Sequence, residues 1–161
     1  MKNIAIQNYS LLEFSIVGLE NGGKFPIEYT GRGKDISPEI IIHNLSPKAK
    51  TIAITLEDTT HIIKDFTHWC IWNIAADNRI EKGIPKGKIV PSLGYAIQVF
   101  AYGLHRYAGP KPPKGKMHIY RFTVYSLDCT IELSANKSKK AFLKIAHNHI
   151  LQKGSILGEF E

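Results

Sequence analysis

The stretch YAGPKPPKGKMHIYRFTVYSLD, residues 107–128, joins a loop rich in proline and glycine to a run with the alternation of a β-strand. Proline fixes φ and has no amide hydrogen, so the three prolines in residues 110–113 make a stiff loop that cannot run inside a sheet. Gly109 and Gly115 allow sharp turns and close backbone approaches. From His118 onward, β-branched and aromatic residues predict a strand. The loop is therefore either a tight surface connection or the wall of a small pocket.

Other segments alternate with the same two-residue period. TIAITLE at 51–57 places Ile52, Ile54 and Leu56 on one face of a predicted strand. HWCIWNIA and YAIQVFAY have the same pattern, and turn signals such as ENGGK and KGIPKGK separate the segments. The short spacing favours antiparallel pairing, so the sequence predicts a mostly β protein.

One segment near the C-terminus follows a helical period instead. The side chains that share its face are Phe142, Ile145, Ala146, His149 and Ile150. Asn136 or Ser138 can cap the start of this helix, and Gly154 fits its end. We expect the helix to pack on a sheet.

Length and composition describe an ordinary globular chain. With 161 residues, of which 43% are hydrophobic and 22% charged, it can bury a core without disulfides, and we expect one domain over residues 1–161. No apolar run suits a transmembrane segment or a signal peptide, so we expect a cytoplasmic protein. Cys70 and Cys129 each have an apolar, strand-like context, which disfavours a redox pair. The net charge of +7 attracts anions without identifying one.

Several catalytic and nucleotide-binding motifs are incomplete or missing. GRGKDI at 31–36 lacks the third glycine and the strand-to-helix turn of a dinucleotide loop. The sequence contains neither a G-x-S-x-G nucleophile elbow nor a Walker loop. A covalent hydrolase would rest only on the presence of Ser, His and Asp somewhere in the chain.

The seven histidines invite a metal interpretation, which their spacing does not favour. His147 and His149 are two residues apart, so on a helix they point in nearly opposite directions. His61, His68 and His118 belong to separate segments that no compact ligand signature joins. We therefore expect no metal and no cofactor.

Four residues from three segments could form one binding site. On a strand, His118 and Tyr120 project from the same face. His68 opens one predicted strand and Asp58 ends another, so both can reach a shared rim. Two imidazoles, a phenol and a carboxylate at such a rim would bind a small phosphate or carboxylate. For each residue alone, a core or surface role is the alternative.

Four blocks of the sequence resemble the phosphatidylethanolamine-binding protein family, especially its bacterial Raf-kinase-inhibitor-like branch. DISPEI at 35–40 is similar to the family's N-x-S-P segment, and HWCIWNI at 68–74 to its H-W-V-V-V-N-I strand. Residues 107–128 resemble its Y-x-G-P-x-P-P-x-G loop, its H-R-Y-x-F strand and its A-L-D ending. NHIL and GEF near the end resemble the G-H-x-L and G-x-Y elements.

The resemblance implies an antiparallel β-sandwich, with a large central sheet, a smaller sheet, a C-terminal helix and short helical segments. It also implies a pocket at one edge that takes phosphate, phosphoethanolamine-like head groups or acetate-like ions. The ligand-binding positions that it implies are Asp58, His68, Gly109, Pro110, Pro112, His118 and Tyr120.

Two positions depart from the family pattern. Its D-P-D-A-P segment reads DTTHI at 58–62, so that Thr60 replaces the second aspartate, and Ile119 replaces the arginine of H-R-Y. A lone carboxylate holds an ammonium group less well than an acidic pair. We therefore expect anion binding with weak discrimination for ethanolamine. Arg121 would replace the missing arginine only after a register shift, which we do not expect.

Three functions compete at this point. The first is a non-enzymatic protein that binds a small anion or phosphorylated ligand, with a phosphoprotein partner and a kinase-inhibitor-like regulatory role as options. The second is a small-ester hydrolase or lyase, in which His68 or His118 is the general base and Asp58 orients it. Nucleic-acid binding ranks last, because Tyr102 and Tyr107 lie near basic residues without any recognised motif. A homodimer is compatible with the resemblance, but no residue requires one.

Overall fold

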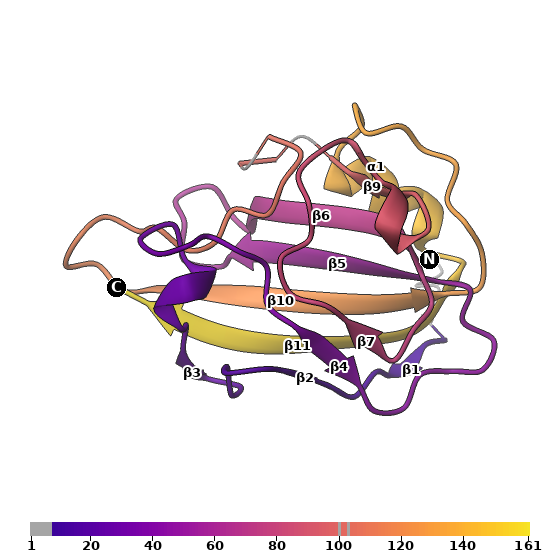
Figure 1. Ribbon diagram of the computed structural model, residues 1–161, viewed down its shortest axis with the longest axis horizontal. Coiled ribbons are helices and arrows are strands. Elements are labelled where there is room, and N and C mark those ends of the chain that lie inside the picture. The colour runs from indigo at the N-terminus through magenta and orange to yellow at the C-terminus, as the bar shows by residue number, and fades with distance from the viewer. Residues whose placement is uncertain (1–7, 100, 103) are drawn as a thin grey trace, which may run out of the picture.

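Figure 1 shows the computed structural model of the chain, which describes residues 8–99, 101–102 and 104–161. Four long strands run side by side across its middle, and the loop before the third of them projects at the end where the C-terminus lies. These strands are β5 (Thr51–Asp58), β6 (Phe66–Ala75), β10 (His118–Leu127) and β11 (Ile150–Phe160).

The four long strands form the centre of the larger of two sheets. Over the described residues this sheet has eight strands, in the order β1-β11-β10-β5-β6-β9-β8, with β3 also paired to β11. The pairings among the long strands are antiparallel, whereas β1 and β3 run parallel to β11. The short members are β1 (Ser10–Leu11), β3 (Gly23–Lys24), β8 (Ile89–Val90) and β9 (Ala96–Gln98).

A smaller antiparallel sheet covers one face of the large sheet and completes the predicted sandwich. Its strands are β2 (Phe14–Ile16), β4 (Ile40–Ile42) and β7 (Arg79–Ile80), and two short 3-10 helices span Ile27–Tyr29 and Pro91–Leu93. Ile52, Ile54 and Leu56 share the face of β5 that packs in this core, as their alternation predicted. The mostly β, antiparallel sandwich expected from the sequence is confirmed.

A second core lies on the opposite face of the large sheet, under the helix α1 (Lys139–Ala146). The rings of Trp72 and Phe142 stack there, with centroids 4.9 Å apart and planes 5° from parallel. Both faces of β5 are thus buried along its whole length, whereas β11 keeps Ser155 and Leu157 exposed. The helix packs on the sheet as expected.

The extent of that helix was predicted wrongly. Ser138 caps its start, because the side chain accepts a hydrogen bond from the amide of Ala141. The helix ends at Ala146, however, and Ile150 begins β11. Gly154 lies inside this strand, where an added Cβ would meet the carbonyl oxygen of Leu12 at 2.1 Å. Although residues 149–150 continue the helical pattern of the sequence, the chain from Ile150 onward forms a strand, because ten of its residues pair with β10.

Three further expectations are refined. Only Ala96–Gln98 of the segment YAIQVFAY pairs as a strand, and Phe100 lies outside the described residues. Cys70 is fully buried, which raises the pKa of its thiol to about 12, but Cys129 is only partly buried. In the described part of the chain, no helix combines the length and apolar character needed to cross a membrane.

Candidate functional site

A small cavity lies where β5 ends and β10 begins, against the proline-rich loop. Its volume is about 120 Å³, well below the roughly 300–1,000 Å³ of pockets for drug-sized ligands, so it suits a small ion or head group. The polar side chains that line it are Asp58, His61, His68, Lys111, His118 and Tyr120. The remaining lining comes from Phe66, Tyr102, Pro112 and Pro113.

Strand register brings three of these side chains together. Tyr120 of β10 lies directly opposite Asp58 of β5, and His118 lies two residues before Tyr120 on the same face. Tyr120 is almost completely buried, and burial raises the pKa of its phenol far above the ordinary value. The hydroxyl therefore keeps its proton and can donate a hydrogen bond to a ligand.

Asp58 is ionised and accepts three hydrogen bonds. Its Oδ2 lies 2.6 Å from Nδ1 of His118, while Oδ1 accepts hydrogen bonds of 2.9 Å from both the amide and the hydroxyl of Thr60. Burial alone would raise the pKa of Asp58, but these hydrogen bonds outweigh it and hold the pKa below the usual value. The carboxylate thus fixes the ring of His118, with Nδ1 as donor and Nε2 directed to other partners.

His68 reaches the cavity because of a β-bulge. Leu56 pairs with Trp69 and Glu57 pairs with Thr67, so His68 is the extra residue in β6 at this point. Plain alternation would place His68 on the same face as Cys70, which belongs to the core under α1. The bulge instead turns the imidazole to the cavity, where its ring lies edge-on to that of Tyr120 with centroids 5.3 Å apart.

His68 presents an acceptor to the cavity. Its Nδ1 donates a hydrogen bond of 3.0 Å to the carbonyl oxygen of Ala108, since a carbonyl can only accept. Burial lowers the pKa of His68 and outweighs the opposing effect of this hydrogen bond. The ring is therefore neutral near pH 7, and Nε2 carries a lone pair until a ligand or a falling pH supplies a proton.

The proline-rich loop is held from behind by residues 29–35. The amide of Gly109 donates to Oδ1 of Asp35 at 2.7 Å, and Arg106 pairs with Oδ2 of the same carboxylate at 2.9 Å. A Cβ at Gly109 would lie 1.9 Å from the carbonyl oxygen of Tyr29, so only glycine fits this approach. The carbonyl oxygen of Pro110 accepts from an amide of the same supporting segment. Gly109 and Pro110 therefore lie behind the cavity wall, whereas Pro112 lines the cavity.

Sequence reasoning missed this support. GRGKDI was rejected as a dinucleotide loop and given no other role, yet it contains Arg32 and Asp35. Arg32 donates a hydrogen bond to the carbonyl oxygen of Pro112. The position of Asp35 at the start of the block DISPEI was the available signal, but the partners of its carboxylate lie more than seventy residues away.

The two departures from the family pattern are accommodated structurally. Thr60 donates to Asp58 and also accepts from the amide of Ile119 at 3.1 Å, so it joins the 58–60 turn to β10. Arg121 points to the opposite face of the sheet, where it pairs with Glu57 at 3.2 Å and Asp65 at 3.1 Å. No register shift brings Arg121 to the cavity, as expected from the sequence.

Other hollows lack a comparable set of side chains. One of about 810 Å³ lies beside β2, and another of about 700 Å³ lies between the start of β6 and α1. Among the described residues that line them, the only histidine is His43. The small cavity is therefore the better candidate for anion chemistry.

Comparisons with known proteins agree with this fold. The family model described as phosphatidylethanolamine-binding protein matches residues 16–161. A UPF0098 protein of Pyrococcus horikoshii is 36% identical over 157 residues, covering 96% of this chain and 78% of that protein. A UPF0098 protein of Methanothermobacter thermautotrophicus is 32% identical over 137 residues, covering 84% of this chain and 89% of that protein.

Solved structures also share the architecture. A Chlamydia trachomatis protein described as a phosphatidylethanolamine-binding protein homologue superposes with a TM-score of 0.81 at 22% identity, covering 94% of this chain and 98% of that one. E. coli YbcL, described as a member of the mammalian family, gives a TM-score of 0.79 at 20% identity over 94% and 99% of the two chains. At these identities the likeness concerns the fold.

Replacing Gly109 with alanine should disturb the loop. The new methyl group collides with the backbone of Tyr29, and overpacking of this kind costs about 1–3 kcal/mol of unfolding free energy. Urea denaturation measures the loss. Gly31→Ala is the matched control, because the three atoms nearest its Cβ, at 3.0–3.4 Å, belong to the side chain of Lys111 rather than to backbone, so this change should cost less. Equal stability of G109A and the parent protein would contradict the close contact.

Proposed function

The chain belongs to the phosphatidylethanolamine-binding protein family, and on that premise we propose that it binds a small anion, such as phosphate or the phosphate group of a phosphorylated ligand, without catalysing a reaction. The observation that carries the proposal is the cavity shared by His68, His118 and Tyr120. Each side chain is fixed by a strand or a bulge, so little conformational entropy is lost on binding.

The charges around the cavity suit an anion that carries a proton. Three hydrogen bonds stabilise the negative charge of Asp58. Lys111 adds a positive charge to the lining. Neutral His68 can accept a hydrogen bond from a protonated phosphate oxygen, while Tyr120 can donate to an unprotonated one. A protonated His118 would add a charge-assisted hydrogen bond from Nε2.

The geometry gives little support to selection for ethanolamine. Selection for an ammonium group requires free acceptor positions on a carboxylate, but His118 and Thr60 already occupy three of the roughly four positions of Asp58. Thr60 supplies a hydroxyl in place of a second carboxylate. An ammonium group would therefore gain little beside the phosphate.

Hydrolase or lyase activity on a small ester is the second candidate. The distance of 2.6 Å between His118 and Asp58 matches a general base held by an orienting carboxylate. Among the described residues that line the cavity there is no Ser or Cys, so water would have to be the nucleophile. Ester turnover that disappears in H118A or H68A would favour this candidate.

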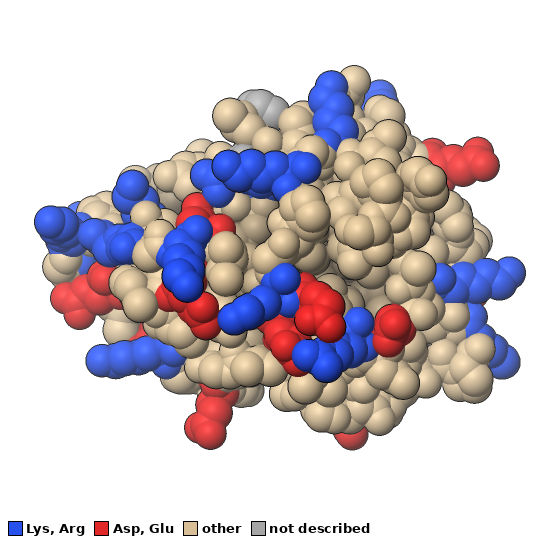
Figure 2. Space-filling model, in the orientation of Figure 1, with Lys and Arg blue, Asp and Glu red and all other residues tan. Residues whose placement is uncertain are grey.

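Nucleic-acid binding remains the least supported function. Figure 2 shows Lys and Arg side chains beside Asp and Glu side chains over the left and central parts of one face. Arg79, for example, pairs with Glu39 at 3.1 Å and with Glu81 at 3.4 Å. A mixed surface of this kind attracts a polyanion less than a continuous basic face.

Five more specific expectations from the sequence analysis remain predictions. They are a cytoplasmic location, one domain over residues 1–161, a homodimer, a phosphoprotein partner and a kinase-inhibitor-like regulatory role. A phosphoprotein partner fits the same chemistry, because a phosphorylated side chain would present the same oxygens to His68 and His118.

Removing the imidazole of His118 should weaken phosphate binding. A hydrogen bond to a charged group contributes roughly 1.5–3 kcal/mol, so we expect affinity to fall about tenfold or more in H118A. Isothermal calorimetry with inorganic phosphate measures this change. His43→Ala, which removes an exposed histidine that lines the separate hollow beside β2, should leave binding unchanged. Parental affinity in a folded H118A would place the anion elsewhere.

Phosphoethanolamine should bind no more tightly than inorganic phosphate, because the oxygens of Asp58 are already engaged. Competition calorimetry of the two ligands gives the ratio of affinities. Restoring the second carboxylate with Thr60→Asp should shift the ratio towards phosphoethanolamine. Far tighter binding of phosphoethanolamine by the parent protein would contradict weak discrimination.

Anion binding should be linked to protonation of His68. Without a ligand, the ring should titrate below the ordinary pKa of about 6.5, because burial disfavours its charged form. A bound dianion favours the charged form and should raise this pKa, so affinity should increase as the pH falls. Sulfate is a suitable probe, because its own charge is constant near neutral pH. Histidine-detected NMR measures the midpoint with and without sulfate.

Two results would speak against this linkage. One is a ligand-free midpoint at or above the ordinary value, which would mean that burial does not control the ring. The other is an unchanged midpoint at saturating sulfate, which would mean that the anion does not contact His68.

A further inference from the structure

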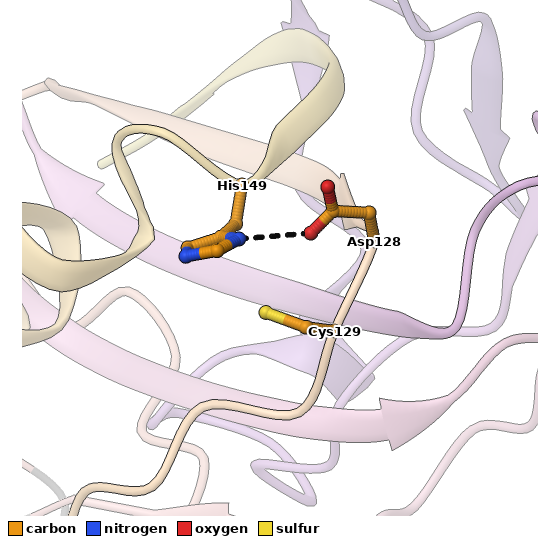
Figure 3. Close-up of side chains that lie close together, drawn as sticks. All are labelled: Asp128, Cys129 and His149. Carbon is orange, nitrogen blue, oxygen red and sulfur yellow. Dashed lines mark hydrogen bonds and ion pairs between the residues drawn. The ribbon is translucent and has the colours of Figure 1, made fainter.

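A second cluster of reactive side chains lies at the far end of β10. Figure 3 shows that the side chains of Asp128, Cys129 and His149 converge on one space. Nδ1 of His149 lies 2.9 Å from Oδ1 of Asp128. One ligand atom from each of the three residues lies within 4.8 Å of the other two.

The fold holds this cluster together through the backbone. Asp128 and Cys129 directly follow β10, and His149 directly precedes β11, where Leu127 pairs with Ile150. The amide of Asp128 donates to the carbonyl oxygen of His149 at 3.1 Å, which extends this pairing by one step.

Cys129 is anchored on its other side. Its carbonyl oxygen accepts a hydrogen bond of 2.7 Å from the hydroxyl of Thr51, the first residue of β5. All three residues of the cluster are thus fixed by the central sheet. Rigid elements position ligand side chains more accurately than mobile loops do.

We propose that Asp128, Cys129 and His149 form a binding site for Zn²⁺ or a similar divalent transition metal. Thiolate, imidazole and carboxylate are the three protein ligand types of zinc, at about 2.0–2.3 Å from the ion. In a tetrahedral site with these bond lengths the ligand atoms lie about 3.3–3.8 Å apart. Side-chain rotations that shorten the present separations of up to 4.8 Å by roughly 1 Å would close the cluster around a metal. Three protein ligands leave the fourth tetrahedral position for water.

Metal binding would displace one proton from Cys129 and one from Nδ1 of His149. The Cys129 thiol releases its proton to solvent and binds as thiolate, since the thiolate is the ligand. A metal bound at Nδ1 of His149 displaces the hydrogen that Nδ1 directs at Asp128. In the neutral ring this proton is transferred through solvent to Nε2, so the imidazole still carries one proton. The side chains of His149 and Asp128 are 43% and 45% exposed, so the ion can enter from solvent.

This metal site is separate from the anion cavity. His118 begins the ten-residue strand β10 and Asp128 follows its end, so at about 3.3 Å per residue they lie roughly 30 Å apart. The sequence did not reveal the site, because residues 147–149 were read as a helix. The helix ends at Ala146, and the chain then turns His149 back to β10.

Titration with Co²⁺, followed by displacement with Zn²⁺, tests the site in the full-length protein. We expect one Co²⁺ per chain and a thiolate-to-metal absorption band in the near ultraviolet. Cys129→Ser should abolish the band and weaken Zn²⁺ binding roughly 100-fold or more, because even the loss of an outer partner costs about 10–100-fold. Cys70→Ala is the matched control, since the Cys70 thiol is fully buried in the core under α1 and is not one of the three ligands, and it should keep the band.

A second variant guards against a folding defect. Asp128→Asn retains an acceptor for the His149 ring but loses the charged ligand, so it should keep the thiolate band while weakening Zn²⁺ binding at least about tenfold. Circular dichroism confirms that each variant is folded. The proposal fails if the parent binds no Co²⁺ with a thiolate band, if the band survives in C129S, or if binding depends on His118 instead.

Discussion

Antiparallel pairing of β10 with β5 on one side and β11 on the other is the constraint on which the other features depend. It sets Tyr120 opposite Asp58 at one end of the sheet and Leu127 opposite Ile150 at the other. A slip of one residue would turn His118 and Tyr120 to the opposite face, under α1. Because both faces of β5 are buried, such a slip would also expose apolar side chains to the wrong core, so the register is strongly specified.

The proposed anion binding depends on polar groups placed at the edge of an apolar core. Tyr120 and His68 are almost entirely buried, and the pKa directions of both favour the neutral form without a ligand. Asp58 keeps its charge through hydrogen bonds from His118 and Thr60. If the cavity binds an anion as proposed, a neutral imidazole in place of a fixed positive charge would make this binding depend on pH and on the protonation state of the anion.

Much of this arrangement could be predicted from the sequence, because local patterns carry it. Alternation located β5 and β10, and three prolines identified the loop. The bulge at His68 could not be predicted from the sequence, because a two-residue period places this histidine on the same face of the strand as Cys70. The role of Gly109 was equally hidden, since its steric partner Tyr29 is eighty residues away. For the last strand, pairing with β10 overrode a local helical pattern.

A crystal structure of the protein soaked in phosphate would test the central claim most directly. The account predicts a tetrahedral density in the cavity, within hydrogen-bond distance of Nε2 of both His68 and His118 and of the Tyr120 hydroxyl, with the proline-rich loop unmoved. Density for water alone at this position, with phosphate bound elsewhere on the molecule, would contradict it.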